Sequence, residues 1–197
     1  MFRTQRRVWH VVATTLITVT FPAIPAAAQS KPSLRAVIIV RHGEKATEPK
    51  ENPPLSPAGE ARAQSLLEAT RQAGITTIIT TDQIRTRATA APLLSALHLQ
   101  GVVVPRSENP KEDAAAVAAA VRRAGGTVLV VGHQLTMPMV IAALGGPAVA
   151  TICDFEYSNM YILLADGSAR LKLLRSHYGT PDPPRTDDCH ITPVSPP

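Results

Sequence analysis

The chain alternates short apolar runs with longer stretches whose apolar residues recur at helical spacing. Residues 34–40 form the clearest run, which is rich in β-branched residues and interrupted only by Arg35. Such a run is typical of a strand buried on both faces of a parallel sheet. Comparable runs predict strands near 35–41, 75–80, 101–104, 127–131 and 159–164.

Four helical stretches lie between these runs. Ser56-Pro57 and Asn109-Pro110 each place a capping residue before a proline, the pattern of a helix start. The helices are predicted over 57–73, 84–97, 110–124 and 136–144. The alternation favours an α/β fold, a three-layer α/β/α sandwich around a mostly parallel central sheet. Asp166-Gly167 is a hairpin signal, so the last strand is expected to be antiparallel at an edge.

The two ends of the chain differ in composition from the middle. Residues 1–28 combine a basic start, an apolar stretch and three alanines, the three-part pattern of an export signal. A membrane anchor is the alternative, but Pro22 and Pro25 interrupt the apolar stretch. We therefore predict a signal peptide at 1–28, one domain at 29–179 and a Pro/Asp-rich tail at 180–197. The exported protein is expected to be periplasmic or secreted, with no stable membrane anchor.

The charge and the cysteine content of the chain limit the classes of binding partner that can be expected. The formal charge of the whole chain is +5, and three arginines of the signal account for most of it. Beyond the signal there is no lysine- or arginine-rich run, and aromatic residues are only 4% of the chain, so neither a basic groove nor a stacking platform for nucleic acid is indicated. The two cysteines, Cys153 and Cys189, are expected to pair in an oxidising compartment, with two free thiols as the alternative.

Candidate chemistry lies where the strands end. Arg41-His42-Gly43-Glu44 follows the first strand, Arg85 follows the second, and Gly132-His133 follows the fourth. Ligands of open α/β sheets bind beyond the carboxyl ends of such strands. Two histidines and arginines facing one crevice would suit phosphate chemistry, because an imidazole can attack phosphorus while arginines bind the oxygens.

These residues and their neighbours resemble the histidine phosphatase superfamily, and most closely its small phosphoglycerate mutase-like members. Four segments carry the resemblance in order along the chain: the Arg-His-Gly signature, a Leu-Ser-x-x-Gly-x-x-x-Ala helix entry, an Arg-Ala-x-x-Thr-Ala-like turn and a Gly-His pair. They lie at 41–44, 55–63, 85–90 and 132–133.

The resemblance implies specific roles. His42 would be the nucleophile that becomes a phosphohistidine, and Arg41, Arg85 and His133 would surround the transferred oxygens, with Gly43 allowing close approach of the substrate. Phosphoryl transfer asks the protein mainly for positioning and charge stabilisation. The sequence has no metal-ligand spacing, and we expect neither a metal nor another cofactor.

Two features depart from the family pattern. Asp82 and Gln83 stand where proline and leucine are usual, and a carboxylate beside an anion site would repel phosphate unless it points away. Arg87 competes with Arg85 as a phosphate ligand. We prefer Arg85 because the Thr89-Ala90 pair fixes the register, and we expect Arg87 on the outer face of the helix.

The group that protonates the leaving oxygen is the least determined. Glu108 is the first choice because it follows the third strand, although a solvated loop glutamate is an equally good interpretation. Asp154, Glu156 and Glu44 are the rivals, and Glu44 could instead only orient His42.

The sequence therefore predicts an exported, metal-independent phosphomonoesterase that works through phospho-His42. Its substrate would be a phosphorylated small molecule or an envelope component. The alternative is a catalytically weak or inactive periplasmic module that binds a phosphate ligand or a protein on the same fold.

Overall fold

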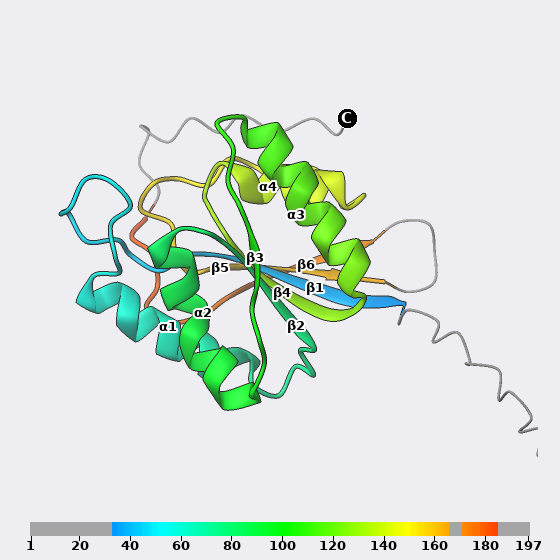
Figure 1. Cartoon of the computed structure of the whole chain (residues 1–197), viewed down its shortest axis with the longest axis horizontal. Coiled ribbons are helices and arrows are strands. Elements are labelled where there is room, and N and C mark those ends of the chain that lie inside the picture. The colour runs from blue at the N-terminus through cyan, green and yellow to red at the C-terminus, as the bar shows by residue number, and fades with distance from the viewer. Residues whose placement is uncertain (1–32, 166–170, 185–197) are drawn as a thin grey trace, which may run out of the picture. The chain divides into compact units, whose positions relative to one another are not determined.

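The computed structural model describes residues 33–165 and 171–184, which form six strands and four helices (Figure 1). The strands are β1 (Leu34–Arg41), β2 (Thr77–Thr81), β3 (Val102–Val104), β4 (Gly126–Gly132), β5 (Asn159–Leu164) and β6 (Lys172–His177). The helices are α1 (Pro57–Thr70), α2 (Ile84–Leu97), α3 (Pro110–Ala124) and α4 (Thr136–Ala143). Every predicted element exists, and most boundaries agree within two residues.

The strands form one sheet in the order β3-β2-β4-β1-β5-β6. The first four of these are parallel, β5 is antiparallel to β1, and β6 is antiparallel to β5. The mostly parallel sheet and its antiparallel edge are confirmed. The strand that reverses the chain direction is β5, one position in from the edge, and the predicted turn at Asp166-Gly167 lies outside the described residues.

Helices cover both faces of the sheet, so the three-layer prediction is also confirmed. Figure 1 shows α1 and α2 on one face and α3 and α4 on the other. Alternate residues of β1 supply the two cores: Val37 and Ile39 pack in the cluster with α3 and α4, whereas Ile38 and Val40 pack in the cluster with α1 and α2. Both faces of β1 are therefore buried, as its continuous apolar run predicts.

Local signals set the helix starts. Ser56 caps α1, with its Oγ accepting a hydrogen bond from the Gly59 N–H at 3.2 Å, and Asn109 caps α3 by accepting from Lys111 N–H at 3.0 Å. The predicted helix over 57–73 is three residues too long, because α1 ends at Thr70. Gly74 lies beyond it in a turn at φ +68°.

Two glycines bring the start of α1 directly against the segment that follows β1. A Cβ atom on Gly59 would lie 2.2 Å from the Glu44 carbonyl oxygen, and one on Gly43 would lie 2.7 Å from the Gly59 carbonyl oxygen. Neither backbone can retreat without moving β1 or α1. This close approach places the 41–44 segment at the end of the sheet.

The chain ends are described only in part. Residues 1–28, Cys189 and most of the predicted tail lie outside the described residues, so the signal, the domain limits and the disulfide remain predictions. Residues 180–184 are packed on the domain: Arg62 donates to the Thr180 carbonyl, and the Asp182 carboxylate accepts from Ser158. Cys153 is buried, and the part of the chain that is described contains no free cysteine. Over the same residues, no helix has the length and apolar character needed to span a membrane.

Candidate active site

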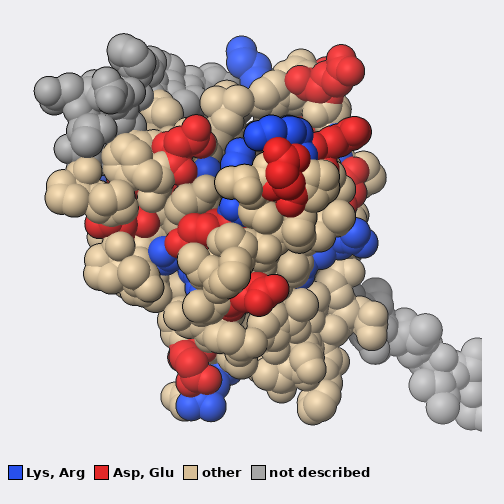
Figure 2. Space-filling model, turned by 90° about the vertical axis from the view of Figure 1, so that its left-hand side faces the viewer, with Lys and Arg blue, Asp and Glu red and all other residues tan. Residues whose placement is uncertain are grey.

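A small pocket of about 180 Å³ lies where β1, β2 and β4 end. Figure 2 views this end of the molecule, where basic and acidic side chains are interspersed over the surface. The pocket is lined by Arg41, His42, Lys45, Arg85, Arg106, His133, Gln134, Leu135 and Asp154. Four of the predicted site residues, Arg41, His42, Arg85 and His133, are thus brought together.

The hydrogen bonds of His42 fix its tautomer. Its Nδ1 lies 2.7 Å from the Gly43 carbonyl oxygen, which can only accept, so Nδ1 carries the proton. Its Nε2 lies 3.1 Å from Arg85 Nε, which can only donate, so Nε2 presents a lone pair. The lone pair faces the cations of the pocket, as a nucleophile for phosphorus requires.

A chain of hydroxyl groups orients His133. Its Nε2 lies 3.0 Å from Thr81 Oγ1, which in turn lies 2.9 Å from Thr86 Oγ1. Thr86 donates to a backbone carbonyl, that of Gln83, at 2.9 Å. The His133 Nε2–H therefore donates to Thr81, the Thr81 hydroxyl donates to Thr86, and Thr86 donates to that carbonyl. His133 Nδ1 is left facing Arg85 at 3.5 Å.

Both histidines are neutral in this pocket. Burial is the main cause that lowers the pKa of His42 to about 2, and the nearby His133, Arg41 and Arg85 lower it further. Burial likewise lowers the pKa of His133 to about 3, with Arg85, Arg106 and Arg41 adding to the effect. The rings of His42 and His133 meet edge-on, with their centroids 5.3 Å apart, so this is a contact between two uncharged imidazoles.

Arg41 is held by a cage of backbone carbonyls. Its Nη1 donates to the carbonyls of Cys153, Asp154 and Glu156 at 2.8–3.0 Å, and its guanidinium lies 4.0 Å from the centre of the Tyr157 ring. Its Nε is buried without a hydrogen-bond partner among the described residues. A buried donor without a partner is energetically costly, so this arginine departs from the usual pairing of buried polar groups.

Arg85 is aimed by residues on both sides of it. Its Nη1 donates to Gln83 Oε1 at 3.1 Å, so the departure from the family pattern at Gln83 supports this arginine. Its carbonyl accepts from Thr89 Oγ1, which also accepts from Gly43 N–H at 2.9 Å. Arg87 is exposed and does not line the pocket, in agreement with its predicted place on the outer face.

Other predicted residues lie elsewhere. Glu108 is exposed and does not line the pocket, because the loop after β3 turns Arg106 rather than Glu108 inwards. Gly43 also does not line it, and its N–H and C=O serve Thr89 and His42 instead. Asp82 is exposed and is not among the residues that line the pocket.

The three rival carboxylates have distinct environments. Glu44 forms a close ion pair with Arg62 at 2.7 Å. Glu156 is buried, and its carboxylate accepts from the Cys153 N–H at 2.6 Å. Asp154 alone of the three lines the pocket, with its side chain 87% exposed and its Oδ1 3.4 Å from Arg41 Nη2.

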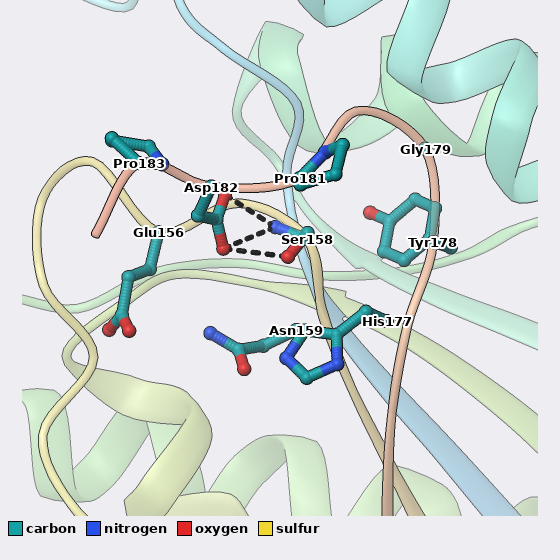
Figure 3. A pocket seen from close by; sticks show the side chains of 9 residues that line it. All are labelled: Glu156, Ser158, Asn159, His177, Tyr178, Gly179, Pro181, Asp182 and Pro183. Carbon is teal, nitrogen blue, oxygen red and sulfur yellow. Dashed lines mark hydrogen bonds between the residues drawn. The ribbon is translucent and has the colours of Figure 1, made fainter. Parts of the chain in front are cut away.

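A larger hollow of about 590 Å³ is lined by residues of the 156–159 and 177–183 segments. Figure 3 shows the side chains of Glu156 and Asn159 extending into it, while Asp182 is bonded to Ser158. None of the described residues that line it is lysine or arginine, and two are carboxylates. It is therefore unsuited to a phosphate group despite its size. Within the described ranges, no group of three or more His, Cys, Asp or Glu side chains could hold a metal ion.

Several solved structures share this fold. A mycobacterial glucosyl-3-phosphoglycerate phosphatase superposes with a TM-score of 0.54 at 16% identity, covering 71% of this chain and 96% of its own. The protein histidine phosphatase SixA complexed with tungstate gives 0.53 at 19% identity, covering 72% and 96%. A phosphoserine phosphatase from Entamoeba histolytica, in complex with 3-phosphoglyceric acid, gives 0.55 at 12% identity, covering 74% and 97%. No curated protein sequence matches the chain.

The sequence model of the histidine phosphatase superfamily (branch 1) matches residues 37–108. The resemblance to the histidine phosphatase superfamily is confirmed. The matched range contains Arg41, His42 and Arg85, three of the four family residues in the pocket. His133 lies beyond the match, and it is the fold that brings it to within 5.3 Å of His42, measured between ring centroids.

Sequence reasoning missed Lys45 and Arg106. Lys45 directly follows the 41–44 segment, which contains the Arg-His-Gly signature, and Arg106 lies two residues after β3. The rule that ligands bind beyond strand ends pointed to this loop. The search for a general acid in it favoured Glu108 and passed over the arginine.

Proposed function

We propose that the protein is an exported, metal-independent phosphomonoesterase that works through a phosphohistidine intermediate on His42. The observation that carries this proposal is the neutral His42, whose Nε2 lone pair faces Arg85 at 3.1 Å. The unpaired buried Nε of Arg41 supplies a second donor for the same anion. An unprotonated imidazole nitrogen that faces two fixed cations is what covalent phosphoryl transfer requires.

In the first step His42 Nε2 forms a bond to phosphorus, the ester P–O bond breaks, and its electron pair stays on the leaving oxygen. The Nε2 lone pair is then used in the bond to phosphorus, so Arg85 donates to the phosphoryl oxygens instead of to Nε2. The Nδ1–H bond to the Gly43 carbonyl, 2.7 Å long, holds the ring in place and stabilises the positive charge that develops on it.

In the second step water attacks phosphorus, the P–N bond breaks, and its electron pair returns to Nε2. The attacking water must lose a proton, and Asp154 is the carboxylate that lines the pocket. We propose that Asp154 takes this proton, in place of the role that the sequence assigns to Glu108. The alcohol or phenol has by then left, with its oxygen protonated by solvent. Inorganic phosphate leaves last with the oxygen of the attacking water, and Asp154 passes its proton to solvent.

The same arrangement favours leaving groups that need little protonation. Asp154 is 87% exposed and ion-paired with Arg41, so it is poorly placed to deliver a proton to an alkoxide. An aryl oxygen departs as a weaker base than an alkoxide does. We therefore expect faster turnover of aryl than of alkyl phosphates.

Export accounts for the remaining features of the chain. We propose that residues 1–28 are removed as a signal and that Cys153 and Cys189 form a disulfide in the periplasm or outside the cell. The substrates would be phosphorylated small molecules or envelope components that reach that compartment.

The test is hydrolysis of 4-nitrophenyl phosphate by the purified chain in excess chelator. We expect turnover, and we expect His42→Gln to reduce kcat/KM by more than about a thousandfold because the nucleophile is lost. His98→Asn is the matched control, since His98 is exposed and lies at positive φ, which asparagine tolerates. Equal slow rates in wild type and His42→Gln, together with phosphate binding, would favour the binding-module alternative.

A further inference from the structure

We propose that the natural ligand carries a second anionic group next to its phosphoryl group, and that Arg106 and Lys45 bind this group. The proposal rests on the proposed function, since it assigns the substrate class of the same pocket. The second group is a carboxylate or a second phosphate.

Arg106 is held at the pocket by a buried carboxylate on α3. Asp113 Oδ2 lies 3.5 Å from Arg106 Nε, and Asp113 Oδ1 accepts from the neighbouring Ser107 N–H at 2.5 Å. The Asp113 side chain is 6% exposed, so this anchor is part of the domain rather than a surface contact. It fixes the loop after β3 so that Arg106 lines the pocket.

The donors of both cations remain available. Asp113 takes only the Nε of Arg106, and the two Nη groups have no hydrogen-bond partner among the described residues. The Lys45 ammonium likewise has no hydrogen bond or ion pair within the described part of the chain. A paired Nε and free Nη groups present a guanidinium end-on, the geometry that binds a carboxylate or a phosphate.

The charge of the pocket exceeds what one phosphoryl group needs. Four cationic side chains, Arg41, Lys45, Arg85 and Arg106, line it together with one carboxylate, Asp154. A phosphate monoester brings a charge of about −1.5 to −2 at neutral pH. The field of Arg106 also reaches the centre of the pocket, where it contributes to lowering the pKa of His133 and of Arg85.

The four cations divide into two pairs by their contacts. Arg85 is hydrogen-bonded to His42, and Arg41 lines the pocket with a buried side chain, so we assign this pair to the transferred phosphoryl group. Lys45 and Arg106 are exposed, have no contact with either histidine among the hydrogen bonds of the described residues, and come from the loops after β1 and β3. Lys45 and Arg106 are therefore placed to bind the leaving group of the ligand rather than its phosphoryl group.

The test compares phosphonates that differ in one charge. Propylphosphonate and 2-carboxyethylphosphonate share a three-carbon chain, but one ends in a methyl group and the other in a carboxylate. 3-Carboxypropylphosphonate extends the spacing by one methylene group. Their dissociation constants are measured by calorimetry on the purified chain, alongside turnover of 4-nitrophenyl phosphate.

We expect one of the carboxylates to bind at least about tenfold more tightly than propylphosphonate, as a charge-assisted hydrogen bond provides. Arg106→Gln and Lys45→Gln should each reduce that ratio severalfold. Arg87→Gln is the matched control, because it removes one exposed arginine of α2 that does not line the pocket, and it should leave the ratio unchanged.

Three results would overturn the proposal: no preference for either carboxylate, a preference that survives in both Arg106→Gln and Lys45→Gln, or an equal loss in Arg87→Gln. The last result would mean that the basic surface only attracts anions at long range. Failure of the proposed function is separate, since it shows as absent turnover of 4-nitrophenyl phosphate whatever the phosphonate affinities are.

Discussion

Two arginines of this protein have equally buried side chains and opposite surroundings. Arg41 and Arg62 each expose 4% of their side chain. Arg62 donates from Nε and Nη2 to both oxygens of Glu44 at 2.7–3.0 Å, and to the carbonyls of Tyr178 and Thr180 at 3.0 Å. Among the described residues, Arg41 contacts a single carboxylate, the exposed one of Asp154 at 3.4 Å, and its Nε has no hydrogen-bond partner.

The difference separates a structural cation from a functional one. The charge of Arg62 is matched by a carboxylate within the domain, and its donors join α1 to the segment that follows β6. The charge of Arg41 is held in place mainly by neutral carbonyls. Its contact with the Asp154 carboxylate is long, and that side chain is 87% exposed, so the charge of Arg41 is matched far less closely. Burying a charge in this way is unfavourable for the empty protein, and an anionic ligand offsets it.

The largest expected effect on stability comes from breaking the Arg62 region. Arg62→Gln leaves the Glu44 carboxylate and two backbone carbonyls without their donor, and we expect the free energy of unfolding to fall by about 3–5 kcal/mol. Urea denaturation measures this loss. Added phosphate should still stabilise the variant, because the pocket that binds it is intact. A variant as stable as wild type would contradict the structural role.

Arg41→Lys tests the other side of the comparison. Lysine keeps the charge but lacks the Nε donor and the planar fork, so we expect kcat/KM for 4-nitrophenyl phosphate to fall by about 10²–10³-fold. The stabilisation by added phosphate should be lost as well. Arg62→Lys is the matched control, and it should reduce stability more than activity. Equal activity of Arg41→Lys and wild type would mean that the unpaired Nε has no role.

The neutral histidines predict a smaller, pH-dependent effect on stability. The pKa of His133 is about 3 in the folded chain and 6.5 in the reference state, so below pH 6.5 the unfolded chain binds the proton first. Its contribution is fully present above pH 6.5 and is lost as the pH falls towards 3, with a slope of up to about 1.4 kcal/mol per pH unit. His42 acts in the same direction.

Urea unfolding of wild type and His133→Asn between pH 7 and pH 4 measures this slope. The variant should lose less stability per pH unit than wild type, whereas the exposed control His98→Asn should match wild type. If His133→Asn kept the full slope, the imidazole of His133 would not be neutral in the folded chain.

The sequence predicted the parts of the site that follow directly from strand ends. His42 and His133 each come after a buried β-branched run, and parallel strands bring such residues to one edge of the sheet. The carbonyl cage of Arg41 could not be predicted, because Cys153, Asp154 and Glu156 are more than a hundred residues away in a loop without regular structure. Every residue has a backbone carbonyl, so residue identity does not show which carbonyls will accept from Arg41.

The remaining differences have the same kind of cause. The pattern of 159–164 predicts a strand but not its direction, so the reversal at β5 was not expected. The choice between Arg106 and Glu108 depends on the contact of Asp113 with this loop, which links a strand exit to a helix start. Pairing of this kind depends on tertiary structure and cannot be obtained from local spacing.

Covalent labelling tests the central claim most directly. The purified chain is incubated with 4-nitrophenyl phosphate in chelator, quenched at alkaline pH, where phosphohistidine survives, and analysed by mass spectrometry. The account predicts a phosphoryl group on His42 that is absent from His42→Gln. Turnover without label on His42, or label on another residue that persists in His42→Gln, would contradict it.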